Sequence, residues 1–594
     1  MLKIKSLITD NNRKWWTLGT VCFALLMIVL DGNVVNLALP TIINEFGATL
    51  AQSEWINNAY LLTFAIFLIT FGRLGDEIGR KKMFSAGLIT FTLGSILCGL
   101  AQNPEQLIIF RVVQGLGGAS MMPATLSLLT ANFKKEERGG AMGLWGAVAG
   151  LGIVLGPIIG GYLTEKGLGD TINNFLGISQ YWRYVFYINI PIGILALIST
   201  FTVIKESKDS EKSHNYDIAG IITSALSIFT LTYAFIEGSA YGWWKAIKAF
   251  SMFGHDIAFG SLSVVPILFL LSIIFAAIFV LIEMNCKKDP LVDLKLFKNR
   301  NFSVGSSTVS ILSFAMMGSF FLLPLFLQTI LGFSAIETGK NLIPFAIAIM
   351  IMSPIAGKLA DKLGGKYLIV TGLAIMSFGG WLLGHFYIDT QIKDLIIPFI
   401  VMGIGMGLTQ APLNNIALLD TPDNEIGGAS GVLSTTRQIG SVMGIAILGA
   451  VLQTSLNNNL SAKLDNIDNM TENIKTIILD NTKNQGMSDD MSKLENQIKT
   501  EMIQNVPQNL SLDTQLTSNL SPDQQQILTE QMAVRQDEMA QKMKKLGEDI
   551  THSVKQSFVD SINHTFKIAA IFALLGALIA FLFKNKENNK SQDY

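Results

Sequence analysis

The chain has 594 residues, of which 50% are hydrophobic and only 15% are charged, and its formal net charge is −1. A soluble protein would carry about 25% charged residues, so this composition argues against a soluble globular protein. A net charge near zero also argues against a nucleic-acid partner. The three cysteines are scattered and form no CxxC pair, so we expect neither a disulfide framework nor a metal site.

Apolar residues gather in blocks of about 20 residues, the length that crosses a bilayer as a helix. Backbone groups in lipid must bond to one another, so each block is predicted to be helical. Fourteen blocks are present: 15–38, 54–72, 83–101, 105–131, 139–163, 184–204, 216–236, 259–282, 302–327, 337–357, 367–388, 394–418, 427–453 and 563–583. The first lacks a clean cleavage site and is interpreted as a span rather than a signal peptide.

Lysine and arginine cluster in alternate loops and near both termini, whereas 39–53, 102–104 and 328–336 contain none. The positive-inside rule therefore places both termini in the cytoplasm, which agrees with an even number of spans. We expect a monomeric, multi-pass protein of the plasma membrane, in contact with the lipid bilayer. The Asn-, Lys- and Ile-rich composition is typical of an AT-rich bacterium.

The first block, FALLMIVLDGNVVNLALP, holds a carboxylate at Asp31 and amides at Asn33 and Asn36. An ionisable residue inside a membrane costs roughly 2.5–3.5 kcal/mol and usually marks a functional site. Helical geometry points both amides away from Asp31, so the three side chains cannot all line one pocket. Either Asp31 titrates in a cavity while the amides bond to neighbouring helices, or the reverse holds.

The second block ends in GRLGDEIGRKKMF, in which Gly72 and Gly79 suit a turn and Asp76 could cap the next helix or pair with a cation. GKLADKLGGK, with Gly357, Asp361 and Gly364, repeats the pattern eight blocks later. This repeat predicts two six-helix bundles with two extra helices between them, the architecture of a transporter with a midplane cavity. The predicted units are 1–204, 205–300, 301–453, 454–562 and 563–594.

The fourth block contains RVVQGLGGASMMP, in which Arg111, Gln114, Gly115, Gly118 and Met122 share one helical stripe. Such a stripe suits a cavity wall or a tight contact between helices. Arg111 could take part in ion coupling, or it could merely lock helices together by bonding to backbone carbonyls.

The fifth block reads GLGIVLGPIIGGYL, with glycines at 152, 156 and 160. Small residues four apart let another helix approach closely, and Pro157 permits a kink. Close packing and a kink are what a rocking interface between the two bundles needs, but taken alone the motif indicates only tight packing. A second arginine within the membrane, Arg437, lies in block thirteen in STTRQIGSVMG.

Residues 454–562 form one large polar insertion, which the topology places outside the cell. Ser521 is predicted as an N-cap and Pro522 as the first residue of a helix. Ile527, Met532, Met539, Met543 and Leu546 fall near one face of it, so a helical pair is expected. The insertion is either a solvated decoration or a lid or docking surface for an extracellular partner.

These motifs together resemble the major facilitator superfamily, and within it the fourteen-helix drug:proton antiporters. The residues that carry the resemblance are LDGNVVNLALP, GRLGDEIGRKK, RVVQGLGGA, GLGIVLGPIIGG, LPLFLQTILGFSAIETGKNLIP and GVLSTTRQIGSVMGIAIL. Two departures stand out. Asn33 occupies a position where the family often has Thr, and block ten lacks the carboxylate that some exporters of dications carry there.

The resemblance implies that Asp31 binds protons or cationic substrate and that Arg111 assists proton coupling. It also implies that Gly156 and Pro157 shape the antiporter interface, and that Asp76 and Arg80 latch the cytoplasmic gate. We predict a proton-coupled exporter of amphipathic, cationic small molecules, driven by the proton motive force without a cofactor. Candidates for the substrate wall are Gln114, Trp55, Tyr60, Phe64, Met122, Trp145, Phe321, Gln328 and Asn414; candidates for gating or packing are Gly72, Asp76, Gly79, Arg80, Gly152, Gly156, Pro157, Gly160, Asp361 and Arg437.

Three other functions compete with this one. An exporter or flippase of a lipid or lipid-linked molecule would also need two related bundles. A receptor or scaffold would use 454–562 as a sensor and would need neither Asp31 nor Arg111. An enzyme is disfavoured, since no Ser/His/Asp set, metal cluster or phosphate loop is evident and the five histidines are dispersed.

Overall fold

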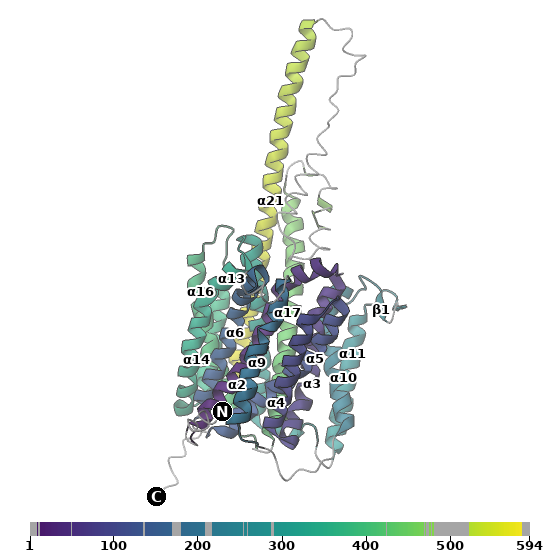
Figure 1. Cartoon of the computed structure of the whole chain (residues 1–594). Coiled ribbons are helices and arrows are strands. Elements are labelled where there is room, and N and C mark those ends of the chain that lie inside the picture. Colours follow the sequence, from purple (N-terminus) through teal and green to yellow (C-terminus); the bar gives the residue numbers. More distant parts are fainter. Residues whose placement is uncertain are drawn as a thin grey trace.

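The computed structural model describes most of the chain. The described residues are 9, 12–48, 50–134, 137–168, 180–207, 217–252, 255–257, 259–286, 290–422, 425–467, 470, 475–476, 478–479 and 522–584. Within them, fourteen helices are long and apolar enough to cross a membrane, as the sequence predicted. Figure 1 shows them as one upright bundle, from which α21 projects at the end opposite the N-terminus.

The membrane-spanning helices follow the predicted blocks with small shifts at their ends. They are α2 (Arg13–Phe46), α3 (Leu50–Ile78), α4 (Arg80–Leu100), α5 (Pro104–Asn132), α6 (Arg138–Lys166), α9 (Asn189–Val203), α10 (Ile218–Tyr241), α11 (Val264–Asn285), α12 (Arg300–Leu325), α14 (Ile343–Leu363), α15 (Lys366–Leu383), α16 (Ile392–Leu418), α17 (Ile426–Leu464) and α21 (Pro522–Ala580).

Short elements complete the described chain. Two of them, η1 (Tyr181–Arg183) and α8 (Tyr184–Tyr187), lead into α9; the others are η2 (Leu294–Lys298), a π-helical turn η3 (Phe326–Ile330) and α13 (Ala335–Asn341). An antiparallel hairpin of β1 (Phe250–Met252) and β2 (His255–Ile257) connects α10 to α11. The sequence did not predict this hairpin, because its strands are only three residues long.

The two halves of the bundle repeat the same helix contacts. In the N-terminal half (α2–α6 and α9), α4 packs on α5, α3 on α5, and α2 on both α6 and α9. In the C-terminal half (α12, α14–α17 and α21), α15 packs on α16, α14 on α16, and α12 on both α17 and α21. The internal repeat inferred from the loops after α3 and α14 therefore extends to whole bundles.

The halves meet along two seams, where α3 packs on α17 and α6 packs on α14. Replacing each helix by its counterpart in the other half turns one seam into the other, as expected for two related halves. The helices α10 and α11 pack on each other, and α10 contacts α3 and α17 beside the first seam. The interior of the molecule is filled by one large apolar cluster that includes residues of both halves.

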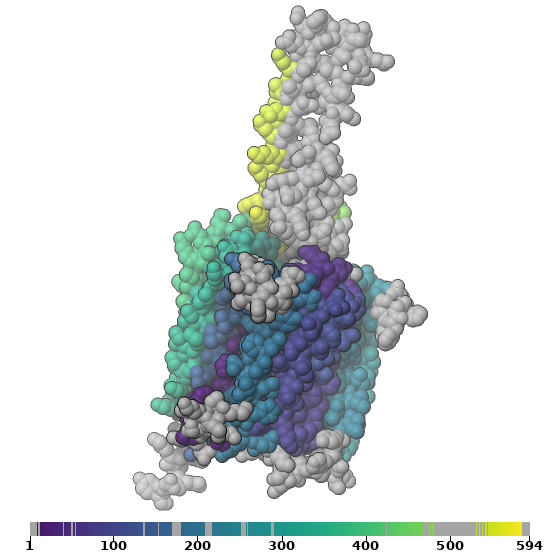
Figure 2. All heavy atoms as spheres, viewed as in Figure 1, coloured from purple at the N-terminus to yellow at the C-terminus, as the bar shows by residue number. Residues whose placement is uncertain are grey.

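Two helices leave the bundle and continue as a stalk. Helix α21 has 59 residues, and α17 runs to Leu464, beyond the predicted end of its block. Leu460, Leu464, Ile550 and Val554 pack together at the base of the stalk. Figure 2 shows α21 projecting well beyond the bundle surface. The sequence predicted a pair of helices here. It did not predict that each would be the unbroken continuation of a membrane-spanning helix.

The predicted start of α21 at Pro522 agrees with the structure. Ser521 lies outside the described residues, as do the side chains of Ile527, Met532, Met539 and Met543. Of the predicted apolar stripe, Leu546 packs against the cluster at the base. We name the bundle end that holds Arg13, Ile78 and Ile426 the terminal face, and the opposite end, from which α17 and α21 project, the stalk face.

Candidate functional site

Asp31 of α2 forms a buried ion pair with Arg111 of α5. Arg111 Nη1 donates to Asp31 Oδ2 at 2.6 Å, and the two side chains are 1% and 0% exposed. Each charge is tolerated in the membrane interior because the other neutralises it. Removing one partner of such a pair is strongly destabilising. The two most conspicuous charges of the apolar blocks are therefore one site.

Three polar side chains complete the shell around Asp31. Gln114 Nε2 and Asn189 Nδ2 donate to Asp31 Oδ1 at 2.7 and 2.9 Å. Both amides also donate to Ser95 Oγ, at 2.8 and 3.2 Å, and the Ser95 hydroxyl donates a hydrogen bond to the carbonyl of Phe91. The shell comes from α4, α5 and α9, so the whole site lies inside the N-terminal half. We name Asp31, Ser95, Arg111, Gln114 and Asn189 the Asp31 cluster.

Arg111 also contacts helix α3. Its Nε donates to the carbonyl of Ile56 at 3.1 Å, and its guanidinium stacks on the ring of Tyr60 at 4.2 Å. Phe64 in turn stacks on Tyr60. Arg111 thus bonds to a backbone carbonyl, as one of the two alternatives from the sequence requires, and it also pairs with a carboxylate. Its part in ion coupling stays a prediction.

The stripe on α5 forms a tight helix contact. A Cβ on Gly115 would lie 2.8 Å from the carbonyl oxygen of Tyr60, and one on Gly118 would lie 3.0 Å from the Phe64 ring. These glycines let α3 approach closely enough for Tyr60 to stack on Arg111. The amides of the first block point elsewhere, as predicted: Asn33 donates to Val29 O at 2.7 Å, and Asn36 accepts a hydrogen bond from Asn57 of α3.

The sequence did not single out Ser95 or Asn189. A serine in a membrane helix commonly bonds to its own backbone, so Ser95 gave no signal. Asn189 could have been identified from the sequence, because it places an amide side chain within the predicted span 184–204. It is fully buried, and it brings α9 into the Asp31 cluster.

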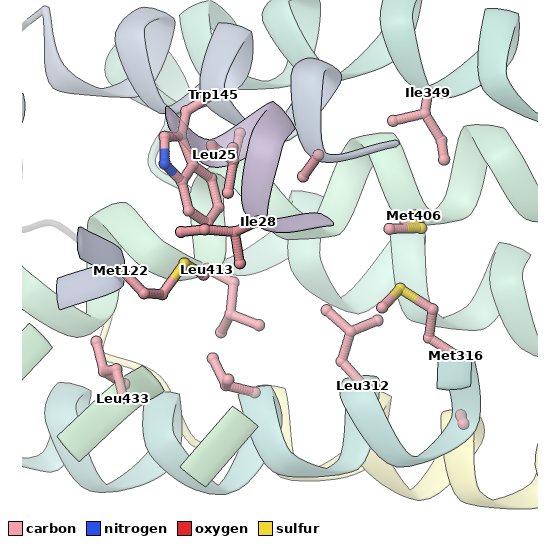
Figure 3. Packing of buried hydrophobic residues seen from close by; sticks show 14 of the residues in the cluster. Leu25, Ile28, Met122, Trp145, Leu312, Met316, Ile349, Met406, Leu413 and Leu433 are labelled. Atoms are coloured by element: carbon pink, nitrogen blue, oxygen red, sulfur yellow. The ribbon is translucent and has the colours of Figure 1, made fainter. Parts of the chain in front are cut away.

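A second cluster lies between the two halves. Arg437 of α17 donates from Nη2 to Asn414 Oδ1 of α16 at 2.6 Å, and its guanidinium lies over the ring of Trp145 of α6 at 5.4 Å. Trp145 Nε1 donates to Thr125 Oγ1 at 3.2 Å. Figure 3 shows Trp145 and Met122 within the apolar packing that also holds Leu413 and Leu433 of the C-terminal half.

At the terminal face, Asp76 links the halves. Its carboxylate accepts hydrogen bonds from the backbone N–H groups of Gly427 and Gly428, each at 3.0 Å, and from Arg80 at 3.0 Å. The first N–H groups of a helix lack partners within it and attract a carboxylate. Asp76 therefore caps α17 and not the next helix α4, whereas its ion pair with Arg80 agrees with the alternative expected from sequence, pairing with a cation. The backbone N–H groups of Lys81 and Lys82 bond to Glu206 instead.

Glycines make this contact between the halves possible. Gly72 lies inside α3 rather than in a turn, and a Cβ there would come within 2.6 Å of Gly427 O. Gly79 does occupy the turn before α4, with a φ of 124°. The predicted counterpart of Asp76 in the repeat, Asp361, lies in α14, but its side chain is outside the described part of the structure.

The glycine face of α6 is a correction to the sequence analysis. Gly152, Gly156 and Gly160 pack against α2 of their own half, where their Cβ atoms would meet Val29, Asn33 and Val34. The glycines of α6 that face the other half are Gly143, Gly146 and Gly150, which approach α14. Near Pro157, a Cβ on Gly339 of α13 would come within 3.2 Å of the proline ring.

Three predicted wall residues lie away from both Arg111 and Arg437. Trp55 packs against Tyr233 of α10, with ring centroids 5.9 Å apart. Phe321 is 38% exposed near Gly449, and Gln328 lies exposed in η3. The described residues contain no group of three His, Cys, Asp or Glu side chains that could hold a metal ion.

Comparisons with known proteins agree with this architecture. The family model of the Major Facilitator Superfamily matches residues 21–445. The multidrug transporter protein MdtP of Bacillus subtilis is 32% identical over 96% of this chain and 93% of its own length. The tetracenomycin C resistance and export protein of Streptomyces glaucescens is 28% identical over 74% of this chain and 76% of its own. A crystal structure of the human organic anion transporter MFSD10 shares the fold, with a TM-score of 0.50 and 13% identity over 74% of this chain and 93% of that one.

Proposed function

The chain belongs to the Major Facilitator Superfamily, and on that premise we propose that it exports amphipathic drug-like molecules in exchange for protons. The observation that carries the proposal is the Asp31–Arg111 pair, a titratable group enclosed inside a membrane-spanning bundle. The names of the multidrug and antibiotic-export relatives support drugs as the substrate class. Both termini are proposed to be cytoplasmic, from the positive loops, and the stalk extracellular.

The Asp31 cluster suggests how a proton could drive the cycle. A proton on Asp31 removes one charge and leaves Arg111 as an unpaired cation, which favours a rearrangement. Arg111 contacts Ile56 and Tyr60 of α3, and the same helix carries Asp76 at its far end. Protonation of Asp31 would therefore loosen, through α3, the contact that closes the terminal face. This supports alternating access, in which the halves rock about a central site.

The preference for a cationic substrate stays a prediction from sequence. All donors around Asp31 come from the protein, so a cationic drug would have to displace Arg111 to reach this carboxylate. We therefore propose that Asp31 exchanges protons and that the substrate binds between the halves, near Trp145 and Met122.

Proteoliposomes test the proposal. When ethidium flows out of the proteoliposomes down an imposed gradient, protons should flow in through the wild-type protein. Asp31→Asn should lose this coupled proton flux. Glu137→Gln serves as a control, because Glu137 is a partly exposed carboxylate outside the membrane-spanning segments, where it pairs with Lys14 at 2.6 Å. Ethidium-dependent proton flux that is equal in wild type and Asp31→Asn would refute Asp31 as the proton carrier.

One observation favours a second candidate function, the export of a lipid or lipid-linked molecule. A groove of about 900 Å³ lies near the stalk face between α17, α21 and Trp243. His564 and Lys567 line it beside the apolar side chains of Ile447 and Val451, an arrangement that suits a headgroup and a chain. Export of a fluorescent phospholipid without export of ethidium would favour this function over drug efflux.

A further inference from the structure

Arg437 is a partly buried cation to which the described residues offer no counter-ion. It lies roughly 16 Å along α17 from Ile426 at 1.5 Å per residue, close to half the thickness of a bilayer core. Among the described residues, no carboxylate pairs with it, and its guanidinium donates a hydrogen bond to a neutral amide oxygen, Asn414 Oδ1. An unpaired charge at this depth is costly, so it indicates a partner that arrives from outside the chain.

The surroundings of Arg437 offer more hydrogen-bond donors than the protein uses. Arg437 Nε and Asn414 Nδ2 are buried and have no hydrogen-bond partner within the described structure. Asn414 is 1% exposed. Both residues line a cavity of about 20 Å³ together with Gln410, Ser313 and Met316. Unsatisfied donors beside a cation are complementary to an oxygen that carries negative charge.

The position of this cavity fits a substrate site that opens with the halves. Trp145 of α6 covers the Arg437 guanidinium from the opposite half. A Cβ on Gly146 of α6 would come within 2.8 Å of Ser353 Oγ and 3.8 Å of Gln410 Cγ, so α6 closes against the same region. Moving α6 away from α14 would uncover Arg437 and leave an aromatic ring on one side and a cation on the other.

We propose that Arg437 and Asn414 bind the anionic oxygen of those exported molecules that carry one, a carboxylate or a phenolate on an aromatic scaffold. Trp145 packs against the aromatic part from the other half. This inference rests on the proposed export function and concerns the anionic members of its substrate range. The C-terminal half thereby recognises the anionic substrate, and the N-terminal half handles the proton.

Binding to the full-length protein in nanodiscs tests this without a proton gradient. The probes are 1-pyrenebutyrate and its methyl ester, which differ by one negative charge, and fluorescence anisotropy gives their affinities. Wild type should bind the acid about tenfold more tightly than the ester, the size expected for hydrogen bonds to a charged group. Arg437→Gln should reduce this ratio to about one, and Arg437→Lys should keep part of it.

A second variant tests the same site independently, in case Arg437→Gln misfolds. Asn414→Asp has nearly the same shape and places a carboxylate where Asn414 Oδ1 now meets Arg437. It should also abolish the preference for the acid, because the new carboxylate pairs with Arg437. Lys393→Gln, the loss of an exposed cation at the start of α16, should leave the preference unchanged.

The outcomes separate this inference from the proposed function. An equal affinity for acid and ester in wild type, or a preference that survives in both Arg437→Gln and Asn414→Asp, would overturn the inference. Ethidium-driven proton flux could still be present in that case, and the export function would stand. A wild-type preference that both variants abolish supports the Arg437 site even if proton flux fails.

Discussion

The two halves of the molecule each carry an arginine inside the membrane, but they treat it differently. In the N-terminal half, Arg111 is 1% exposed and is neutralised by Asp31 at 2.6 Å. In the C-terminal half, Arg437 has a neutral amide partner and an aromatic ring from across the interface. The same fold thus holds a self-contained charge pair in one half and an open charge in the other. This difference suggests that the halves divide proton and substrate between them.

The largest expected difference is in stability. Arg111→Gln should destabilise the fold by about 3–5 kcal/mol, because it leaves Asp31 as an unpaired buried charge. Arg437→Gln should cost less, about 1.5–3 kcal/mol, because it loses a hydrogen bond to Asn414 but leaves no buried carboxylate without its partner. Thermal unfolding in detergent measures both.

The double variant Asp31→Asn/Arg111→Gln is the control for this comparison. It removes both charges and should recover part of the stability that Arg111→Gln loses. If Arg111→Gln and Arg437→Gln melt at the same temperature, the contrast between the paired and the open arginine is wrong.

The next effect concerns the contact between the halves at the terminal face. Asp76→Asn removes the charge that caps α17 through Gly427 and Gly428, and hydrogen bonds to charged groups are worth about 1.5–3 kcal/mol. The closed form should lose population. A cysteine at Ser430, which is fully buried here, should then react faster with a membrane-impermeant maleimide in a background without native cysteines. Glu137→Gln, which removes a partly exposed carboxylate at the same face, should not change the rate. An unchanged rate in Asp76→Asn would exclude a latch.

Replacing a packed glycine by alanine should destabilise the C-terminal half more than the N-terminal half. A Cβ at Gly444 of α17 would lie 2.2 Å from the carbonyl oxygen of Phe314, whereas one at Gly156 of α6 would meet the Asn33 side chain at 2.6 Å. Overpacking costs about 1–3 kcal/mol, and a backbone atom yields less than a side chain. Gly444→Ala should therefore destabilise more than Gly156→Ala in thermal unfolding. Gly32→Ala, with nothing within 4 Å, should be tolerated, and the reverse order would contradict the packing described.

The smallest effect is expected at an exposed ion pair, the opposite extreme from Arg111. Lys14 Nζ lies 2.6 Å from Glu137 Oε1 at the terminal face, and its hydrogen bond lowers the pKa of Glu137. A lowered pKa contributes stability above the unfolded-state pKa, and that stability is lost as the pH falls through the folded-state pKa. The difference in melting temperature between wild type and Lys14→Gln should be slight at pH 7 and vanish in acid. A difference that grows in acid would have the wrong sign.

Much of the fold could be predicted from sequence because membrane helices carry their signal locally. Length, apolarity and positive loops indicated fourteen spans, and the repeated glycine and aspartate pattern indicated two halves. The stalk was only partly predictable, since polarity marks where a helix leaves lipid but not whether it ends there. Helix α21 continues from Pro522 to Ala580 through a segment rich in Gln, Lys, Glu and Met, which are good helix formers.

The site was harder to predict, because its contacts join residues far apart in sequence. Asp31 and Arg111 could be named singly from the cost of a charge in lipid, but their pairing depends on how α2 packs on α5. Asp76 shows the same limit: its position suggested that it caps α4, while the fold brings the first turn of α17 to it. The α6 glycines were identified as a packing face, but the choice of partner, α2 rather than the other half, required the structure.

The central claim is that Asp31 exchanges a proton when substrate binds, while Arg437 does not take part in that exchange. The most direct measurement is proton release on adding ethidium to the detergent-solubilised protein in weak buffer, followed with a pH dye. We predict release from wild type and from Arg437→Gln, and none from Asp31→Asn. Equal release from Asp31→Asn would contradict the account and place the exchangeable proton on another residue.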